Sequence, residues 1–142
     1  MKVLIIGGNR FVGKKLVKTL LKNKNQVTVL NRSGTGPDGA TKIKFDRNIK
    51  SDILSFNFNK FDCIVDMCLF KPEQFKLVKN LIPESTNYIF VSSGAVDYID
   101  TKSFGDYAIE KMDVEKSLSQ TDLNYKIIRP SYIVGIGNHR PR

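Results

Sequence analysis

The chain alternates short apolar runs, which are typical of β-strands, with longer runs in which apolar residues recur every three or four positions, as on one face of an α-helix. The strand-like runs are Val3–Ile6, Val27–Leu30, Ile43–Phe45, Cys63–Val65, Tyr88–Val91 and Tyr125–Ile128. The helix-like runs are Phe11–Leu21, Phe75–Leu81 and Tyr107–Leu118. Strands separated by helices indicate βαβ units, and strands apolar throughout are typical of parallel strands covered on both faces. The sequence therefore predicts an α/β fold, a doubly wound parallel sheet with helices on both faces.

The size and charge of the chain limit the classes of partner that it can bind. With 142 residues, 41% of them hydrophobic, it is long enough for one domain with its own core. Its formal net charge of +9 is high for this length. A solvated, lysine-rich surface explains such a charge, and so does attraction to the phosphates of a dinucleotide or a nucleic acid. The lysines are spread along the sequence, so no basic arm is indicated.

The apolar runs and the cysteines indicate a cytoplasmic, reduced protein. Val3–Ile6 is shorter than the roughly 7–15 apolar residues of a signal-peptide core, and no stretch approaches the roughly 20 of a membrane span. Cys63 and Cys68 stand at an odd separation along one apolar stretch, so on a strand they point to opposite faces, too far apart to bond. The single histidine, His139, argues against a Ser-His-Asp triad or a histidine-based metal site, and the cysteines lack zinc spacing.

A glycine-containing turn joins the first strand to the first helix. It reads Gly7-Gly8-Asn9-Arg10-Phe11-Val12-Gly13. In such a turn the first glycine allows a sharp reversal, the last lets the helix pack on the strand, and the helix N-terminus faces a pyrophosphate. An ordinary glycine turn is the alternative. The position between a strand and an amphipathic helix, with a second strand next, favours nucleotide binding.

This turn resembles the G-x-x-G-x-x-G turn of the extended short-chain dehydrogenases, in the NAD-dependent epimerase/dehydratase family. It is closest to a branch with a glycine-glycine-threonine-arginine-phenylalanine-isoleucine-glycine turn, which includes epimerase-like proteins and the chloroplast stem-loop RNA-binding proteins. The resemblance implies a Rossmann-type fold with cofactor contacts from Gly7, Arg10, Phe11, Val12 and Gly13. Arg10 stands where the middle glycine usually lies, so either its side chain meets phosphate or cofactor binding is weakened.

The end of the second strand bears on the choice between NAD and NADP. An NAD site carries a carboxylate here for the ribose hydroxyls, whereas an arginine suits a 2′-phosphate. This chain has Asn31 and Arg32 at that point, and no acid. A solvent-exposed arginine is the alternative, but we expect NADP to be preferred. Asp46 and Arg47, after the third strand, resemble the family's adenine-contacting pair, although they also fit a plain turn.

The Tyr-x-x-x-Lys pattern of the superfamily occurs twice in this chain, at Tyr107–Lys111 and at Tyr98–Lys102. Side chains four residues apart meet only on a helix. Tyr107 and Lys111 share one face of a predicted helix with Val114 and Leu118, whereas the other pair lies in a polar, aperiodic loop. A phenol, with an ordinary pKa near 10, needs a nearby ammonium to act as a base at neutral pH. We therefore expect Tyr107 and Lys111 to be the catalytic pair.

Two further segments resemble the family's motifs. Val91-Ser92-Ser93-Gly94-Ala95-Val96 is similar to its Ser-Ser-x-x-Val segment, which implies that Ser93 binds the substrate oxygen. A helix cap or turn is the alternative. The family's next residue is tyrosine, but Asp97 stands there and Tyr98 follows. Ile128–Gly135 is similar to the segment that passes under the nicotinamide, which implies cofactor contacts from Pro130 and Tyr132.

Together these motifs imply an NAD(P)-dependent oxidoreductase or epimerase acting on a nucleotide sugar or a similar hydroxylated substrate. The resemblance runs from Met1 to about Asn138, and family members continue into a smaller C-terminal substrate domain that nothing here matches. We therefore expect residues 1–142 to be the cofactor-binding part of a longer protein, inactive alone. An RNA-binding protein on the same fold and a non-catalytic dinucleotide sensor are the alternatives. An intact Tyr107–Lys111 pair favours the enzyme.

Overall fold

A six-stranded parallel sheet forms the centre of the molecule. The computed structural model describes residues 1–101 and 104–135, and within them the strand order is β3-β2-β1-β4-β5-β6. The strands are β1 (Lys2–Ile6), β2 (Gln26–Asn31), β3 (Thr41–Lys44), β4 (Cys63–Asp66), β5 (Asn87–Val91) and β6 (Tyr125–Ile128). The chain begins in the middle, winds to one edge, and returns through β4 to the other. This order confirms the predicted doubly wound, Rossmann-type sheet.

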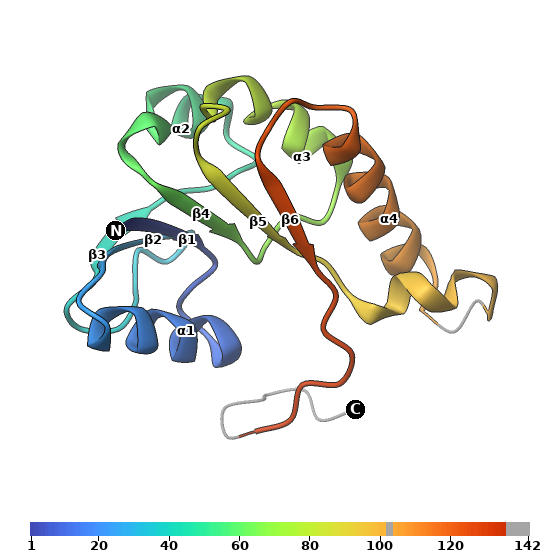
Figure 1. Ribbon diagram of the computed structural model, residues 1–142, viewed down its shortest axis with the longest axis horizontal. Coiled ribbons are helices and arrows are strands. Elements are labelled where there is room, and N and C mark those ends of the chain that lie inside the picture. Colours follow the sequence, from blue (N-terminus) through green and yellow to red (C-terminus); the bar gives the residue numbers. More distant parts are fainter. Residues whose placement is uncertain (102–103, 136–142) are drawn as a thin grey trace.

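Helices cover both faces of the sheet, as predicted (Figure 1). Helix α1 (Phe11–Lys22) lies on one face, and α2 (Lys50–Ser55), α3 (Pro72–Lys76) and α4 (Asp106–Ser119) lie on the other. Three 3₁₀ turns complete the described elements: η1 (Phe58–Lys60), η2 (Lys79–Leu81) and η3 (Gly94–Thr101). Two hydrophobic clusters result, one between the sheet and α1 and a larger one beneath the other helices.

The apolar run of β1 is explained by burial on both faces. Successive side chains of a strand point to opposite faces of the sheet. Leu4 and Ile6 therefore join the larger cluster, while Val3 and Ile5 pack with Val17 of α1. None of the four β1 side chains is more than 5% exposed. A strand in this position has no solvent face, so it cannot alternate apolar with polar residues.

The predicted helix over Phe75–Leu81 was wrong in its bounds. Helix α3 begins at Pro72 and ends at Lys76, and a separate 3₁₀ turn follows. The start is fixed by Pro72, whose ring favours the first helical turn, and by Gln74, whose side-chain oxygen accepts hydrogen bonds from the backbone N–H groups of Phe70 and Lys71. Apolar spacing gave no sign of these local caps. The six-residue α2, which buries one side chain, was missed for the same reason.

A buried charged cluster ties three segments together at the end of β4. The carboxylate of Asp66 is fully buried and accepts hydrogen bonds from Arg47 Nη2 at 2.6 Å and from the Tyr88 hydroxyl at 2.9 Å. Its other oxygen accepts from the backbone N–H of Cys68 at 3.1 Å. Burial lowers the pKa of Arg47, but pairing with Asp66 outweighs burial and raises it. Burial, reinforced by Asp66, raises the pKa of Tyr88 well above its usual value.

We predict that Asp66→Asn destabilises the fold by about 3–5 kcal/mol, because it leaves the buried Arg47 cation without its counter-ion. Asp38→Asn makes the same chemical change in a solvent-exposed pair with Lys42, and we expect no measurable loss there. Urea denaturation at neutral pH, followed by circular dichroism, compares the two. Equal losses for the two variants would contradict a special role for the buried pair.

Candidate nucleotide-binding and catalytic site

The candidate site lies at the carboxyl edge of the sheet. Because all six strands run parallel, residues that follow β1, β4 and β5 emerge at the same edge. In the pairing register, Ile6 is opposite Asp66, and Asp66 is opposite Phe90. The glycine turn after Ile6 and Ser93 after β5 therefore lie at one edge. The strand order reverses between β1 and β4, which is where ligands of open α/β sheets bind.

The glycine turn is closed so tightly that side chains are excluded. Gly7 has a φ of +95°, and its N–H donates to the carbonyl of Leu30 at 2.9 Å. A Cβ at Gly7 would also collide with Cys68 Sγ, and a Cβ at Gly13 would lie 2.8 Å from the Gly7 carbonyl oxygen. The missing Cβ atoms thus let the turn pack against Cys68 and against its own backbone, which are the roles of the first and last glycines in a nucleotide-binding turn.

The N-terminus of α1 has no side chain that caps it. Arg10 occupies the N-cap position, is exposed, and makes no capping hydrogen bond. The free N–H groups of the first turn can therefore serve an anion. Phe11 and Val12 are half-buried in this turn, and Phe11 has a positive φ of 34°. The ring of Phe11 lies beside Gly135, where a Cβ would be 3.5 Å away.

The loop after β2 is fastened to the glycine turn. Asn31 Oδ1 accepts hydrogen bonds from the backbone N–H groups of Ser33 and Thr35 at 3.1 and 3.2 Å. Asn9 of the glycine turn donates to the hydroxyls of the same two residues at 3.2 and 3.3 Å. Arg32 is exposed within this loop, and in the described part of the chain its guanidinium has no partner. A free cation beside two hydroxyls suits a phosphate group.

Asp46 and Arg47 form a turn whose side chains are already engaged. Asp46 is half-buried, and its Oδ1 accepts from the backbone N–H of Asn48 at 3.0 Å, as in an Asx turn. Arg47 points inward to Asp66 and is 8% exposed. One guanidinium nitrogen of Arg47, Nη1, is buried without a hydrogen-bond partner. Any contact of Arg47 with an adenine ring would have to come from its main chain.

Lys111 of α4 reaches the ends of two strands. Only 2% of the residue is exposed, and its ammonium donates to the carbonyls of Leu69 at 2.8 Å and Val91 at 3.1 Å. Burial lowers the pKa of Lys111 to about 8, although the charge of Asp66 opposes the shift. The lysine therefore holds α4 against the carboxyl ends of β4 and β5 while keeping a positive charge at neutral pH.

Aromatic rings surround this ammonium. Lys111 Nζ lies 4.7 Å from the centre of the Phe70 ring, 4.8 Å from that of Phe90 and 6.0 Å from that of Tyr107. Tyr107 is half-buried, and its ring centre is 6.4 Å from that of Phe70. Lys111, Val114 and Leu118 are buried along the same face of α4. The predicted helical face is confirmed, and it brings a positive charge close to the Tyr107 ring.

The two serines after β5 differ in their surroundings. Ser93 is half-buried, and its hydroxyl accepts from the backbone N–H of Ala95 at 3.2 Å, which leaves its proton available to a ligand. Ser92 is buried and donates to Glu115 Oε1 at 2.5 Å. Arg129 binds the Glu115 carboxylate through Nε at 3.0 Å and Nη2 at 2.5 Å. This network fixes the backbone that carries Ser93.

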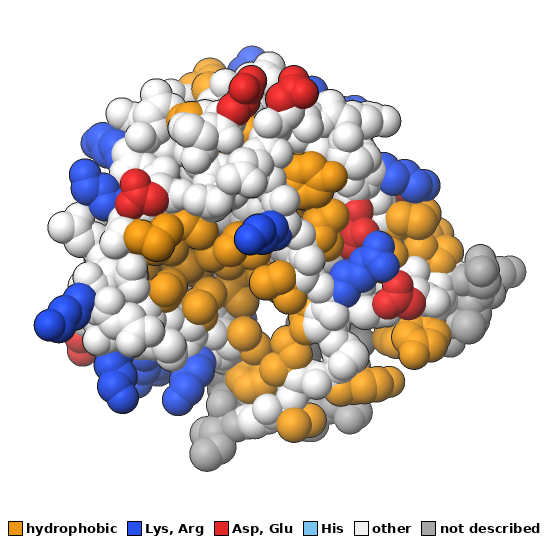
Figure 2. Space-filling view, in the orientation of Figure 1, with side chains coloured by type: hydrophobic (Ala, Val, Ile, Leu, Met, Phe, Trp, Pro, Cys, Tyr) orange, Lys and Arg blue, Asp and Glu red, His pale blue; other side chains and the backbone are white. Residues whose placement is uncertain are grey.

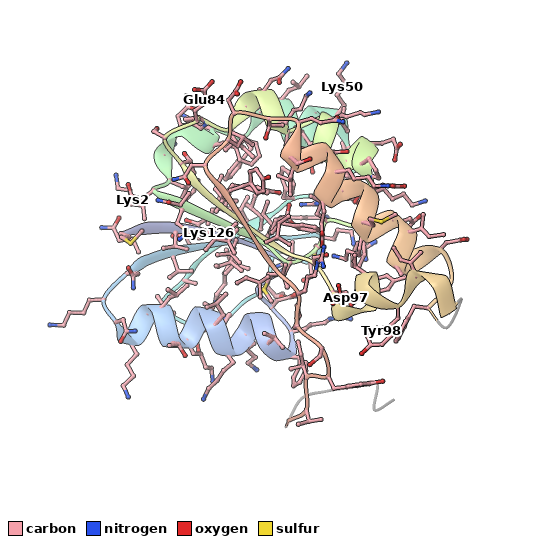
Figure 3. All side chains as sticks on the ribbon, turned by 45° about the vertical axis from the view of Figure 1, so that its right-hand side comes forward. Lys2, Lys50, Glu84, Asp97, Tyr98 and Lys126 are labelled. Atoms are coloured by element: carbon pink, nitrogen blue, oxygen red, sulfur yellow. The ribbon has the colours of Figure 1, made fainter. Side chains whose placement is uncertain are left out.

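Of the rival pair, only Tyr98 lies among the described residues. Tyr98 is 57% exposed in η3, between β5 and α4, and its non-helical φ of −123° interrupts that element (Figure 3). Asp97, beside it, accepts from Arg129 Nη1 at 2.7 Å, which gives the residue in the family's tyrosine position a role of its own. Lys102 and His139 lie outside the described residues.

The chain leaves β6 along the same edge and passes toward α1 (Figure 1). The carbonyl of Pro130 accepts from the N–H of Gly94 at 2.8 Å, next to the serines. Five residues later, Gly135 lies against the ring of Phe11. Pro130 is half-buried, and Tyr132 is 80% exposed between these two contacts. The segment 129–135 therefore spans the edge from the serines to the glycine turn.

Comparison with known proteins supports the resemblance in sequence and in fold. No family model matches the chain. A chloroplast stem-loop binding protein of 41 kDa from Arabidopsis thaliana is 29% identical over 173 aligned residues, which cover 99% of this chain and 44% of that protein. The chain thus spans less than half the length of this curated relative.

Solved structures give the fold. The Bordetella bronchiseptica enzyme WbmH, determined with NAD⁺, matches with a TM-score of 0.77 and 15% identity, over 99% of this chain and 58% of its own. A UDP-glucose 4-epimerase matches with a TM-score of 0.70 and 21% identity, over 93% of this chain and 51% of its own. This chain therefore shares the Rossmann-type fold of these two enzymes. Among residues 1–101 and 104–135, no helix is long and apolar enough to cross a bilayer.

Sequence reasoning missed several residues that organise the carboxyl edge of the sheet. They are Asp66, Leu69, Phe70, Tyr88, Ser92, Glu115 and Arg129. A signal for Glu115 was present, because it stands four residues after Lys111 and eight after Tyr107, on the same helical face. Asp66 ends an otherwise apolar strand, where an acid calls for a partner. The partner Arg47 could not be found from spacing, since it is 19 residues away.

We predict that Glu115 makes stability depend on acid pH. Burial raises the pKa of Glu115, but hydrogen bonds from Arg129 and Ser92 outweigh burial and hold it below its usual 4.5. Its contribution is therefore present above about pH 4.5 and is lost as the pH falls through the lowered pKa. Glu115→Gln should lower the free energy of unfolding by about 1–3 kcal/mol at pH 7. The difference in unfolding free energy between the variant and wild type should become smaller below about pH 4.5.

Urea denaturation at pH 7, 5 and 3.5 tests this dependence. Glu110→Gln is the matched control, because Glu110 lies on the same helix in a more exposed ion pair with Lys71. We expect little change for the control at any pH. A gap between wild type and Glu115→Gln that stays constant from pH 7 to 3.5 would contradict the role given to the carboxylate.

Proposed function

We propose that the complete protein is an NAD(P)-dependent oxidoreductase of the epimerase/dehydratase type, acting on a nucleotide sugar or a similar hydroxylated substrate. This chain would be its cofactor-binding part. The observation that carries the proposal is that the glycine turn and Ser93 follow parallel strands at one edge of the sheet, where Lys111 also contacts the end of β5, 6.0 Å from the Tyr107 ring. A site that only bound a nucleotide would need the first of these alone.

The residues at this edge fit a dinucleotide. Gly7 and Gly13 allow the tight turn that brings the N-terminus of α1 to this edge, where its first turn (Arg10, Phe11 and Val12) would offer N–H groups to the pyrophosphate. Arg32 would hold the 2′-phosphate of NADP, in a loop that Asn31 shapes. NADP is therefore proposed over NAD. Asp46 and the Arg47 main chain would border the adenine, and Pro130 and Tyr132 the nicotinamide.

The proposed chemistry divides between cofactor and protein. The nicotinamide, when bound, accepts or donates a hydride. Tyr107 would exchange a proton with the substrate hydroxyl, and Ser93 would donate a hydrogen bond to the same oxygen. The Lys111 ammonium, 6.0 Å from the centre of the Tyr107 ring, would place a positive charge beside the reacting groups. Its two carbonyl partners hold that charge in place.

The comparisons support this proposal at a coarser level. The Bordetella enzyme was solved with NAD⁺, and the second similar structure is that of a UDP-glucose 4-epimerase. Both are longer than the segment matched here, which agrees with a second domain that completes the substrate pocket. We propose a cytoplasmic location, since Cys63 and Cys68 are free thiols.

Nucleic-acid binding is the second candidate, because the Arabidopsis relative is named for binding a stem-loop. Binding alone needs no tyrosine at position 107. The placement of Tyr107 beside a buried ammonium therefore favours the enzyme. A dinucleotide sensor, the third alternative, would keep the glycine turn and show no turnover.

We predict that Arg32→Ala weakens NADPH binding by roughly 10–150-fold and NADH binding little. One charge-assisted contact to the 2′-phosphate contributes about 1.5–3 kcal/mol, and NADH lacks that phosphate. Fluorescence titration of the complete protein with both cofactors measures the effect. Lys24→Ala is the control, because it removes an equal charge beyond the far end of α1. Equal losses for NADPH and NADH, or none, would remove Arg32 from the proposed phosphate site.

We predict that Tyr107→Phe lowers the turnover of the complete protein by a factor of about 10²–10⁴, the usual effect of losing a positioned acid–base group. Phenylalanine keeps the ring next to Phe70, so folding and cofactor binding should survive. Tyr98→Phe is the matched control and should cost far less. The assay follows nicotinamide absorbance with the nucleotide sugar that wild type converts fastest. Wild-type turnover by Tyr107→Phe would overturn the enzyme proposal.

A further inference from the structure

The positive charge of the chain is concentrated in its first quarter. Residues 1–37 contain eight of the 23 lysines and arginines and none of the 14 acids, the first of which is Asp38. Nearly the whole net charge of +9 therefore comes from this segment, and the rest of the chain is almost balanced. The even spread of the lysines hides this asymmetry, which comes from the missing acids. A surface that is only solvated mixes both signs.

The structure gathers half of these cations on one helix. Lys14, Lys15, Lys18 and Lys22 are all exposed on α1. Lys14, Lys18 and Lys22 follow at four-residue intervals, so they share one exposed face, beside the face that buries Gly13 and Val17. We call these four lysines the α1 ridge. Figure 2 shows Lys and Arg side chains at the lower left, where Figure 1 places α1, and Figure 3 shows long side chains leaving that helix away from the sheet.

No acid neutralises the ridge in the described part of the chain. None of its four lysines has a carboxylate within 4 Å among residues 1–101 and 104–135. Asp38, the first acid along the chain, is paired with Lys42 at 3.1 Å. The ridge therefore presents a row of uncompensated charge about 12 Å long, at a rise of roughly 1.5 Å per residue.

The ridge is distinct from the proposed dinucleotide site. A pyrophosphate would meet the N-terminus of α1, whereas Lys18 and Lys22 lie about 6 and 12 Å farther along the helix axis than Lys14. A membrane surface is also a poor match. The apolar face of α1 is packed on the sheet, with Val17 fully buried, so it has no apolar side chains to insert into lipid.

We propose that the α1 ridge binds the phosphate backbone of a nucleic acid. A straight row of cations on a rigid helix suits a regular polyanion, and each lysine that meets a phosphate releases a condensed counterion. The bond is electrostatic, so it needs no pocket and reads no sequence. This proposal is independent of the oxidoreductase proposal, because the ridge runs along the exposed face of α1 and away from its N-terminus, where a pyrophosphate would bind.

The test compares two triple variants of the complete protein by fluorescence anisotropy. Lys14→Gln/Lys18→Gln/Lys22→Gln removes three ridge charges, and Lys50→Gln/Lys60→Gln/Lys76→Gln removes three exposed charges elsewhere. Glutamine matches lysine in helix propensity, so α1 should persist, which circular dichroism checks. The probes are a labelled RNA hairpin, a DNA hairpin of the same sequence, and phosphatidylserine vesicles, in salt from about 50 to 200 mM.

We expect the ridge variant to bind the better hairpin roughly tenfold or more weakly at about 100 mM salt, with the slope of log K against log salt reduced by about 2–3. The control variant should lose far less, and NADPH affinity should be unchanged in both. Tighter binding of either the RNA hairpin or the DNA hairpin supports the proposal and shows which nucleic acid supplies the phosphates. Equal losses in the two variants, binding to vesicles only, or a parallel loss of NADPH affinity would overturn it.

Discussion

Burial of the central strands on both faces is the constraint that decides where chemistry can occur in this molecule. β1 and β4 are covered by helices or packed side chains on both faces, so their middle residues are apolar. Polar side chains are found only where these strands end. Since all strands run the same way, their ends meet at one edge. The glycine turn, Asp66 and the two serines lie at this edge because the middle of each central strand is buried on both faces.

The charges at this edge are each compensated by a different device. Asp66 is neutralised by Arg47 and by the Tyr88 hydroxyl, deep in the protein. Glu115, nearer the surface, is held by Arg129 and Ser92. Lys111 has no acid at hydrogen-bond distance in the described residues and relies on two carbonyls and surrounding rings. The cation beside Tyr107 is thus the one held without a direct ion pair in the described residues.

Periodicity in the sequence was enough for the sheet, the long helices and the placement of the glycine turn. Those features depend on burial, which leaves a repeating signal: β1 is apolar throughout, and α4 repeats Tyr107, Lys111, Val114 and Leu118 on one face. Short elements and tertiary pairs leave no such signal. Helix α3 depends on one proline and one glutamine, and the partner of Asp66 comes from a loop 19 residues away. The acid-free first quarter was visible in the sequence, but its gathering on one face needed α1.

The two hydrogen bonds of Lys111 have a consequence for how this fold diverges in evolution. A descendant that abandoned turnover would still retain the lysine, because losing it would leave the carbonyls of Leu69 and Val91 unpaired inside the protein. Tyr107 is half-buried and carries no comparable structural burden. Selection for stability alone would preserve Lys111 but would allow Tyr107 to be substituted. On the proposed mechanism, retention of Tyr107 would therefore distinguish catalytic from non-catalytic relatives.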